Sequence, residues 1–284
     1  MKKLLFILTI LNTFIFANIN TVVSILPIQT FVKAIGGDKV NVTLMVLPGN
    51  SPHTYEPKPS QMRAVAKAQL YFAIGVEFEK VWLPKFKDLN PSMKVIDLSE
   101  GIQRLPMVKG HHHKHNTHHD TTKSSDPHIW TAPENVAHIA HKIYETLAKA
   151  DPDHALYFKE NFEKFLQTVK KTDKTIKGIL SHIPKGTKFM VFHPSWGYFA
   201  KAYGLVQIPV EVEGKAPKPR EMVMLIKEAK EEKVSAIFTQ PEFSDSSAKV
   251  IASELHIPVI KVSPLAENWS ENLIRIANAI AGVR

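Results

Sequence analysis

Short apolar runs alternate with amphipathic segments along most of this chain, and this alternation limits the possible fold more than any other feature. In the first half, apolar runs at 21–26, 40–47 and 70–75 are separated by segments with helical spacing. The second half repeats the plan, with runs at 188–192 and 234–240. Strands that alternate with helices pair in parallel and are covered by those helices. The sequence therefore predicts an α/β protein with two lobes and mostly parallel sheets.

One proline-free stretch separates the two halves. Apolar residues recur at helical spacing from Ala155 to Ile176, and no proline occurs between 153 and 183. A helix of about 28 residues would be roughly 40 Å long, which is enough to join two lobes as one rigid element. We therefore expect an N-terminal lobe at 18–150, a linking helix at 151–182 and a C-terminal lobe at 183–284.

The first 17 residues are typical of a secretory signal peptide. Lys2 and Lys3 precede an apolar segment, and Ala17 is small enough for cleavage. Asparagines interrupt the run before it reaches the length of about 20 residues that a membrane span needs. The chain has no cysteine, which excludes disulfides, cysteine metal sites and lipid attachment at an N-terminal cysteine. These features predict a soluble periplasmic protein with no membrane span after cleavage.

The composition is that of an ordinary globular protein, with 44% hydrophobic and 22% charged residues. The formal net charge is +9 and includes Lys2 and Lys3 of the leader. The other basic residues are scattered or lie on helical faces. A solvated surface explains this pattern better than nucleic-acid binding, which export also disfavours.

Three histidines occur where a predicted strand gives way to a loop or a helix. They are His53 in "SPHTYEPKPSQ", His128 in "DPHIWTAPENV" and His193 in "FHPSWGYFAKAYGL". Ligands of open α/β sheets bind outside the carboxyl ends of strands. Each of the three also lies beside a proline that stiffens its loop. This placement indicates a metal site, although a lone histidine at a strand end more often caps or packs.

A second group of histidines lies in a polar loop at 110–126. The run has six histidines in nine positions: His111, His112, His113, His115, His118 and His119. The loop has no apolar residue to anchor it, and ligands that must be ordered by the metal lose conformational entropy on binding. We expect weak auxiliary metal binding here, or a solvated spacer. Deleting 111–119 is expected to leave one tight site. His138 and His141, three apart on a predicted helix, are expected to be a solvated pair.

Four motifs together resemble the substrate-binding proteins of metal-ion ABC importers, in particular those of the zinc branch. Three contain the histidines above, and the fourth is "QPEFSDSSAKVIASELHIPVIKVSPL". The resemblance covers nearly the whole mature chain, and a His-rich insertion before "DPHIW" is typical of the zinc branch. It implies two α/β lobes joined by one long helix, with the metal between them. It also implies a membrane permease as partner, and we expect a monomer that is not an enzyme.

The resemblance implies that His53 and His128 bind Zn²⁺ from the first lobe and His193 from the second. Manganese-type relatives usually have a carboxylate at the third position, so His193 favours zinc; manganese or another divalent metal is the alternative. Relatives often have an aspartate ligand where this chain has Ser263, so the fourth position is expected to be Ser263 or water, with a loop histidine or a nearby carboxylate as further options. Asp126 could orient an imidazole.

Two other functions fit parts of the pattern. Three histidines with one open position also form a catalytic zinc site, but the chain has no HExxH motif, and the acid nearest to His53, Glu56, lies in a proline-rich loop. A zinc hydrolase is therefore the weaker alternative. A metal buffer or adhesin without delivery would instead depend on the histidine run.

Overall fold

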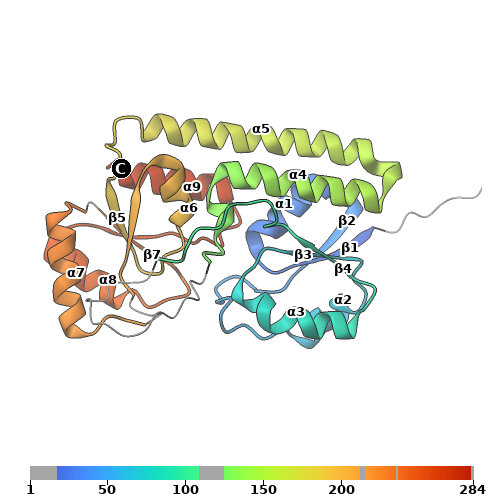
Figure 1. The fold of residues 1–284 in the computed structure, drawn as a ribbon, viewed down its shortest axis with the longest axis horizontal. Coiled ribbons are helices and arrows are strands. Elements are labelled where there is room, and N and C mark those ends of the chain that lie inside the picture. The colour runs from blue at the N-terminus through green and yellow to red at the C-terminus, as the bar shows by residue number, and fades with distance from the viewer. Residues whose placement is uncertain (1–17, 109–124, 212–214, 235, 283–284) are drawn as a thin grey trace, which may run out of the picture.

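The computed structural model describes residues 18–108, 125–211, 215–234 and 236–282. Within these ranges the chain forms two α/β lobes, each built on a four-stranded parallel sheet. Figure 1 shows the lobes side by side, with one long helix, α5, lying across both of them. The predicted fold class, two lobes with parallel sheets, is confirmed. The expected signal peptide and the histidine run at 111–119 lie outside the described residues.

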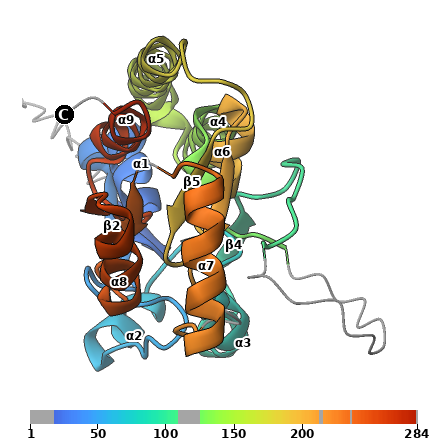
Figure 2. The same ribbon diagram turned by 90° about the vertical axis from the view of Figure 1, so that its left-hand side faces the viewer.

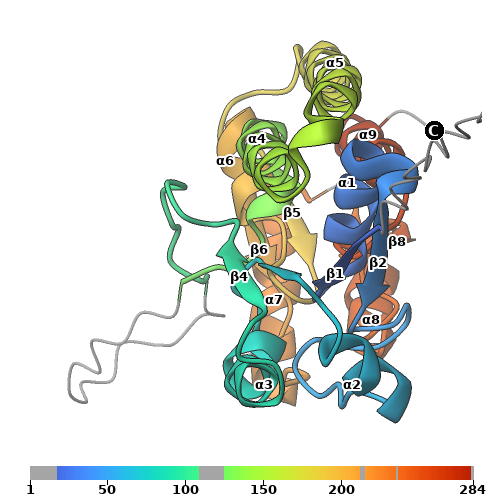
Figure 3. The same ribbon diagram turned by 90° about the vertical axis from the view of Figure 1, so that its right-hand side faces the viewer.

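The first lobe has the strand order β2-β1-β3-β4. Its elements are β1 (Ile19–Val23), α1 (Leu26–Gly36), a 3₁₀ turn (Gly37–Lys39), β2 (Val40–Leu44), α2 (Pro59–Val65), β3 (Leu70–Ala73), α3 (Glu77–Leu89) and β4 (Lys94–Asp97). Figure 3 shows α2 and α3 on the opposite side of this sheet from α1. Every residue of the central strand β3 is buried, which explains its continuous apolar sequence.

The second lobe repeats this layout with the strand order β6-β5-β7-β8. Its elements are β5 (Lys188–Val191), α6 (Gly197–Tyr203), β6 (Val206–Pro209), α7 (Pro219–Glu231), β7 (Ile237–Thr239), α8 (Ser246–Leu255), β8 (Val259–Lys261) and α9 (Trp269–Ile280). In Figure 2, α7 and α8 lie together on the outer side of this lobe. Because β5 and β7 pair in parallel, their carboxyl ends lie at the same edge of the sheet.

The connection between the lobes begins with a 3₁₀ turn (Ile129–Thr131) and α4 (Pro133–Ala150). It continues through a second 3₁₀ turn (Pro152–His154) into α5 (Ala155–Ile179). At 25 residues α5 is about 38 Å long. It packs against α4, α1 and α9, so elements of both lobes support it along its length. Gly37 lets α1 approach it closely, because a Cβ there would lie 2.1 Å from the Tyr157 hydroxyl.

A single hydrophobic core runs through both lobes. It joins residues of the first lobe, such as Phe31 of α1, to Phe189 of β5 and Trp269 of α9, all of them buried. A smaller cluster that includes Met190 and Ile251 fills the outer part of the second lobe. Because apolar surface is shared between the lobes, pulling them apart would expose it to water.

Two tryptophans, one from each side, donate indole hydrogen bonds between the lobes. The indole of Trp130 donates to the carbonyl of Pro264 at 2.7 Å, and the indole of Trp269 donates to the carbonyl of Trp130 at 2.7 Å. Nearby, the Tyr198 hydroxyl accepts from the amide of Leu105 and donates to the carbonyl of Asp126, each at 3.0 Å. The connection beside the cleft is therefore fixed by directed bonds as well as by apolar packing.

Candidate metal centre

The three histidines that the sequence places at strand ends line one cleft between the lobes. His53 lies in the segment between β2 and α2, His128 directly precedes the first 3₁₀ turn of the connection, and His193 follows β5 by two residues. All three belong to the lining of a cavity of about 560 Å³. The ring centroid of His193 lies 5.5 Å from that of His53 and 5.6 Å from that of His128.

These separations are close to what a tetrahedral zinc ion requires. With Zn–N bonds of 2.0–2.1 Å, the centroids of two bound imidazoles lie roughly 5 Å apart. Across the part of the chain that the structure describes, however, no three His, Asp or Glu side chains already form a group that could hold a metal ion. Metal binding would therefore require side chains that line the cleft to change position.

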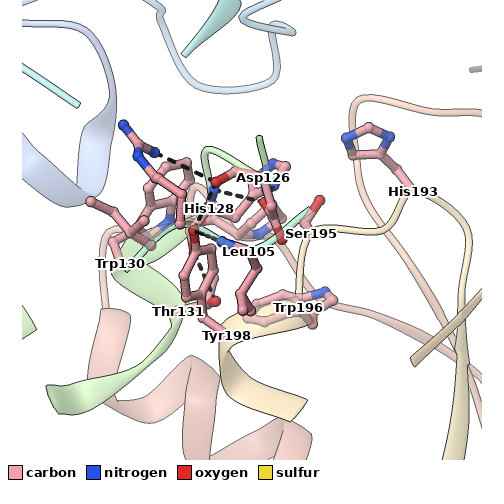
Figure 4. A network of polar contacts seen from close by, with 12 residues as sticks. Leu105, Asp126, His128, Trp130, Thr131, His193, Ser195, Trp196 and Tyr198 are labelled. Carbon is pink, nitrogen blue, oxygen red and sulfur yellow. Dashed lines mark hydrogen bonds and ion pairs between the residues drawn. The ribbon is translucent and has the colours of Figure 1, made fainter. Parts of the chain in front are cut away.

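His128 is held from behind by a buried carboxylate. Its Nδ1 lies 2.7 Å from Oδ1 of Asp126, which also accepts the backbone amide of His128 at 2.9 Å. Figure 4 shows Asp126 and His128 together in this network, whereas His193 stands apart on the other lobe. With Nδ1 engaged, Nε2 is the ring nitrogen left to face a metal, which is the usual arrangement of a ligating histidine.

His193 has the same arrangement in the second lobe. Its Nδ1 lies 2.9 Å from Oε1 of Glu211, a carboxylate that is itself buried. Its Nε2 is buried and, within the described residues, has no hydrogen-bond partner. A buried polar nitrogen without a partner costs free energy unless something binds it. This atom is the clearest sign in the structure that the cleft accepts an electrophilic ligand.

Two further contacts fix the ring and backbone of His193. The ring of Phe243 stacks on it at a centroid distance of 5.0 Å. The side chain of Gln240 accepts the amide of His193 at 3.2 Å and donates to its carbonyl at 2.6 Å. Both residues follow β7, the strand that pairs with β5. The neighbouring strand thus holds His193 in place.

His53 is the most exposed of the three, and its surroundings favour the neutral imidazole. Partial burial lowers its pKa, and the nearby His193 and His128 lower it further. A neutral imidazole has a lone pair free for a metal, whereas an imidazolium has none. His53 is therefore ready for ligation at neutral pH without losing a proton.

Ser263, at the position of the expected fourth ligand, is engaged with its neighbours. Its hydroxyl donates to Oε1 of Glu242 at 3.2 Å and accepts the amide of Leu265 at 3.0 Å. Glu242 lines the cleft with the three histidines. Burial raises the pKa of this carboxyl, while the hydrogen bond from Ser263 acts in the opposite direction.

The other described histidines lie away from the cleft. His138 contacts the carbonyl of Glu100 at 2.9 Å, and His141 lies 3.9 Å from a carboxylate oxygen of Glu145 on the same helix. Neither belongs to the cavity lining. They form no joint site in the described structure, in line with the expectation of a solvated pair.

The sequence did not point to two acidic residues that the structure brings to this centre, Glu211 and Glu242. Asp126 was expected as an orienting group because it precedes His128 by two residues. Glu211 and Glu242 are distant from His193 in sequence and reach it only because β6 and β7 flank β5. The available signal was that Glu242 follows the end of a predicted strand, 234–240, as the histidines follow theirs.

The chain matches the family model described as ZnuA, the periplasmic component A of a zinc-uptake complex, over residues 21–281. It belongs to this family. A crystal structure of ZnuA superposes with a TM-score of 0.84 at 41% identity, covering 93% of this chain and 98% of that one. The family consists of substrate-binding proteins of transport systems rather than enzymes.

Two curated relatives differ in the metal that their names state. The zinc-binding protein AdcA of Streptococcus pyogenes is 27% identical over 262 residues, which cover 87% of this chain. The match covers 50% of AdcA, so the chain spans about half the length of this relative. The manganese ABC transporter lipoprotein PsaA of Streptococcus mitis is also 27% identical, with coverage of 89% and 86%. Among the described residues, no helix has the length and hydrophobicity needed to cross a bilayer.

Proposed function

We propose that this protein captures Zn²⁺ in the cleft between its lobes and delivers it to the membrane permease of an ABC importer. The observation that carries the proposal is the buried, unpartnered Nε2 of His193, which faces a cleft that His53 and His128 also line. Membership of the ZnuA family supports both the metal and the role in uptake. His53, His128 and His193 are the proposed ligands.

The ligand set favours zinc over manganese. Imidazole nitrogen suits zinc, copper and nickel, whereas manganese prefers carboxylate and water oxygen. In this chain the carboxylates of Asp126 and Glu211 face the Nδ1 atoms of the histidines, where they would orient the rings rather than bind the ion. Manganese, the metal in the name of PsaA, is the second candidate.

Capture outside the cytoplasm is part of the same proposal. The family model describes a periplasmic component, and the first 17 residues have the pattern of a cleavable leader. The protein would work as a monomer, and the histidine run at 111–119 would bind additional zinc weakly. The tight site would need neither this run nor a second copy of the chain.

Zinc titration of the full chain against a chromophoric chelator tests this function. His53→Ala, His128→Ala and His193→Ala should each weaken zinc binding by at least about tenfold, because each removes one of a few strong bonds. His138→Ala, on the helix surface, is the matched control and should bind like the wild type. Unchanged tight binding in His193→Ala would show that the metal lies elsewhere. A wild type that prefers manganese would move the protein to the second candidate.

A further inference from the structure

Among the described residues, three carboxylates line the cleft, and two of them make other contacts. Glu77 forms an ion pair with Lys80 at 2.8 Å near the surface. Glu79 is buried and accepts the backbone amides of Ile74 and Gly75. Glu242 remains: its Oε1 accepts a hydrogen bond from Ser263, and its carboxyl belongs to the lining of the cleft with the three histidines.

Glu242 and His193 each follow the end of one of two paired strands. Glu242 follows β7 by three residues, as His193 follows β5 by two, and these strands pair in parallel. The residues around Glu242 are fastened to the histidine, since Gln240 bonds its backbone and Phe243 stacks on its ring. Glu242 is thus carried by the same short segment that holds His193.

Glu211, the other acid at this histidine, is on the wrong side of the ring. It bonds Nδ1, whereas a metal would bind Nε2 on the opposite side of the imidazole. Its place behind His193 corresponds to that of Asp126 behind His128. Only a carboxylate in front of the rings could enter the coordination sphere.

We propose that Glu242 supplies the fourth zinc ligand and that Ser263 is its positioning residue; this rests on the proposed zinc capture. A carboxylate oxygen binds zinc at 2.0–2.2 Å and would complete a tetrahedral set with three imidazoles. It would also place a negative charge in direct contact with the Zn²⁺ ion. The serine hydroxyl fixes Oε1 and leaves Oε2 for the metal.

This arrangement explains how the chain can lack an aspartate at position 263. The hydroxyl of Ser263 is a poor zinc ligand, but it is well suited to donate a hydrogen bond to a carboxylate from the neighbouring strand. The anionic oxygen then comes from the segment after β7.

Zinc affinity and the visible spectrum of the cobalt-loaded protein test the proposal together. Glu242→Gln should weaken zinc binding by at least about tenfold, and it should alter the cobalt d–d bands because a charged ligand is lost. Ser263→Ala should weaken zinc binding by a smaller factor and leave the cobalt bands in place. Glu77→Gln is the matched control for a charge in the same cleft, and it should change affinity by less than about threefold.

The outcomes separate the two proposals. If Glu242→Gln binds zinc like Glu77→Gln, or if its affinity falls while the cobalt bands are unchanged, Glu242 is not a ligand and the inference is wrong. If the wild type itself binds no zinc tightly, the proposed function fails, and the inference with it. A zinc-bound crystal structure with Oε2 of Glu242 at 2.0–2.2 Å from the ion would establish the bond directly.

Discussion

Glu79 is a buried carboxyl that lines the metal cleft but has its own network. It accepts the amides of Ile74 and Gly75 and a hydrogen bond from Ser24, whose hydroxyl also contacts Tyr71. Burial raises the pKa of Glu79 to about 7, against the opposing effect of these hydrogen bonds. The folded protein therefore binds a proton here at pH values where the unfolded chain has released it.

This shift predicts a pH-dependent stability for the zinc-free protein. Because the folded-state pKa is raised from 4.5 to about 7, the contribution of Glu79 is fully present below pH 4.5 and is lost as the pH rises towards 7. The loss amounts to up to about 3 kcal/mol in the free energy of unfolding. Urea unfolding of the wild type and Glu79→Gln at pH 5 and pH 8 measures it.

The amide of Glu79→Gln cannot ionise, so the wild type should lose stability relative to this variant as the pH rises. Comparing the difference between the two proteins cancels the titration of all other groups. Glu77→Gln, whose carboxylate lies at the surface, is the control and should follow the wild type. A difference that stays constant with pH would mean that Glu79 is ionised in the folded protein throughout.

Two helices of the second lobe end in the left-handed conformation with different residues. Gly204, directly after α6, has φ at +70°, and His256, directly after α8, has φ at +55°. A residue with a Cβ is strained in this conformation, and glycine is not.

Replacing His256 with glycine should therefore stabilise the protein. The relief of left-handed strain is about 1–2 kcal/mol, and the greater freedom of glycine in the unfolded chain offsets part of it, leaving a gain of about 0.5–1 kcal/mol. Thermal or urea unfolding of His256→Gly measures the gain. Gly204→Ala is the reciprocal control and should lose stability. Equal stability of wild type and His256→Gly would show that the histidine makes compensating contacts.

At the scale of elements, the success of sequence reasoning depended on how local each signal was. Buried strands such as β3 and β5 are visible as apolar runs, and the observed limits of α5, 155–179, fall inside the proline-free stretch. The helix α3 was not anticipated, because Pro84 lies inside it and a proline normally ends a helical pattern. Phe78 and Phe86, on either side of the proline, are buried and pack against each other, so tertiary packing supports the helix.

The residues of the candidate site also differ in whether a local sequence motif indicates them. His53, His128 and His193 could be proposed because each lies in a local motif at a strand end, and their ligand role stays a prediction. Glu211 and Glu242 could not be proposed, because their approach to His193 depends on the order of β6, β5 and β7 in the sheet. That order is set by tertiary packing, which no short motif records.

At the scale of the whole molecule, the two lobes share one core and a reciprocal pair of indole hydrogen bonds. We therefore expect the zinc-free protein to unfold in a single cooperative transition, with equal calorimetric and van't Hoff enthalpies. Trp269→Phe keeps an aromatic ring but removes the pyrrole part of the indole with its N–H, so the carbonyl of Trp130 loses this hydrogen bond. This variant should lose about 1–3 kcal/mol and still unfold in one step.

Differential scanning calorimetry of the two proteins checks this expectation. Trp82→Phe, on the half-buried surface of α3, is the control for loss of an indole outside the connection. Two resolved transitions in the wild type would mean that the lobes fold independently in spite of their common core. If they unfold together, the shared core and the indole hydrogen bonds join the lobes into one cooperative unit.

The contact between His128 and Trp130 gives the protein an optical property. The two rings lie 5.3 Å apart, and the indole borders the cleft in which the ion would sit. An imidazole that binds a cation changes the electric field at the adjacent indole, so the emission of Trp130 would differ between the empty and loaded protein. The chain would thus report its own occupancy by intrinsic fluorescence, without an added dye.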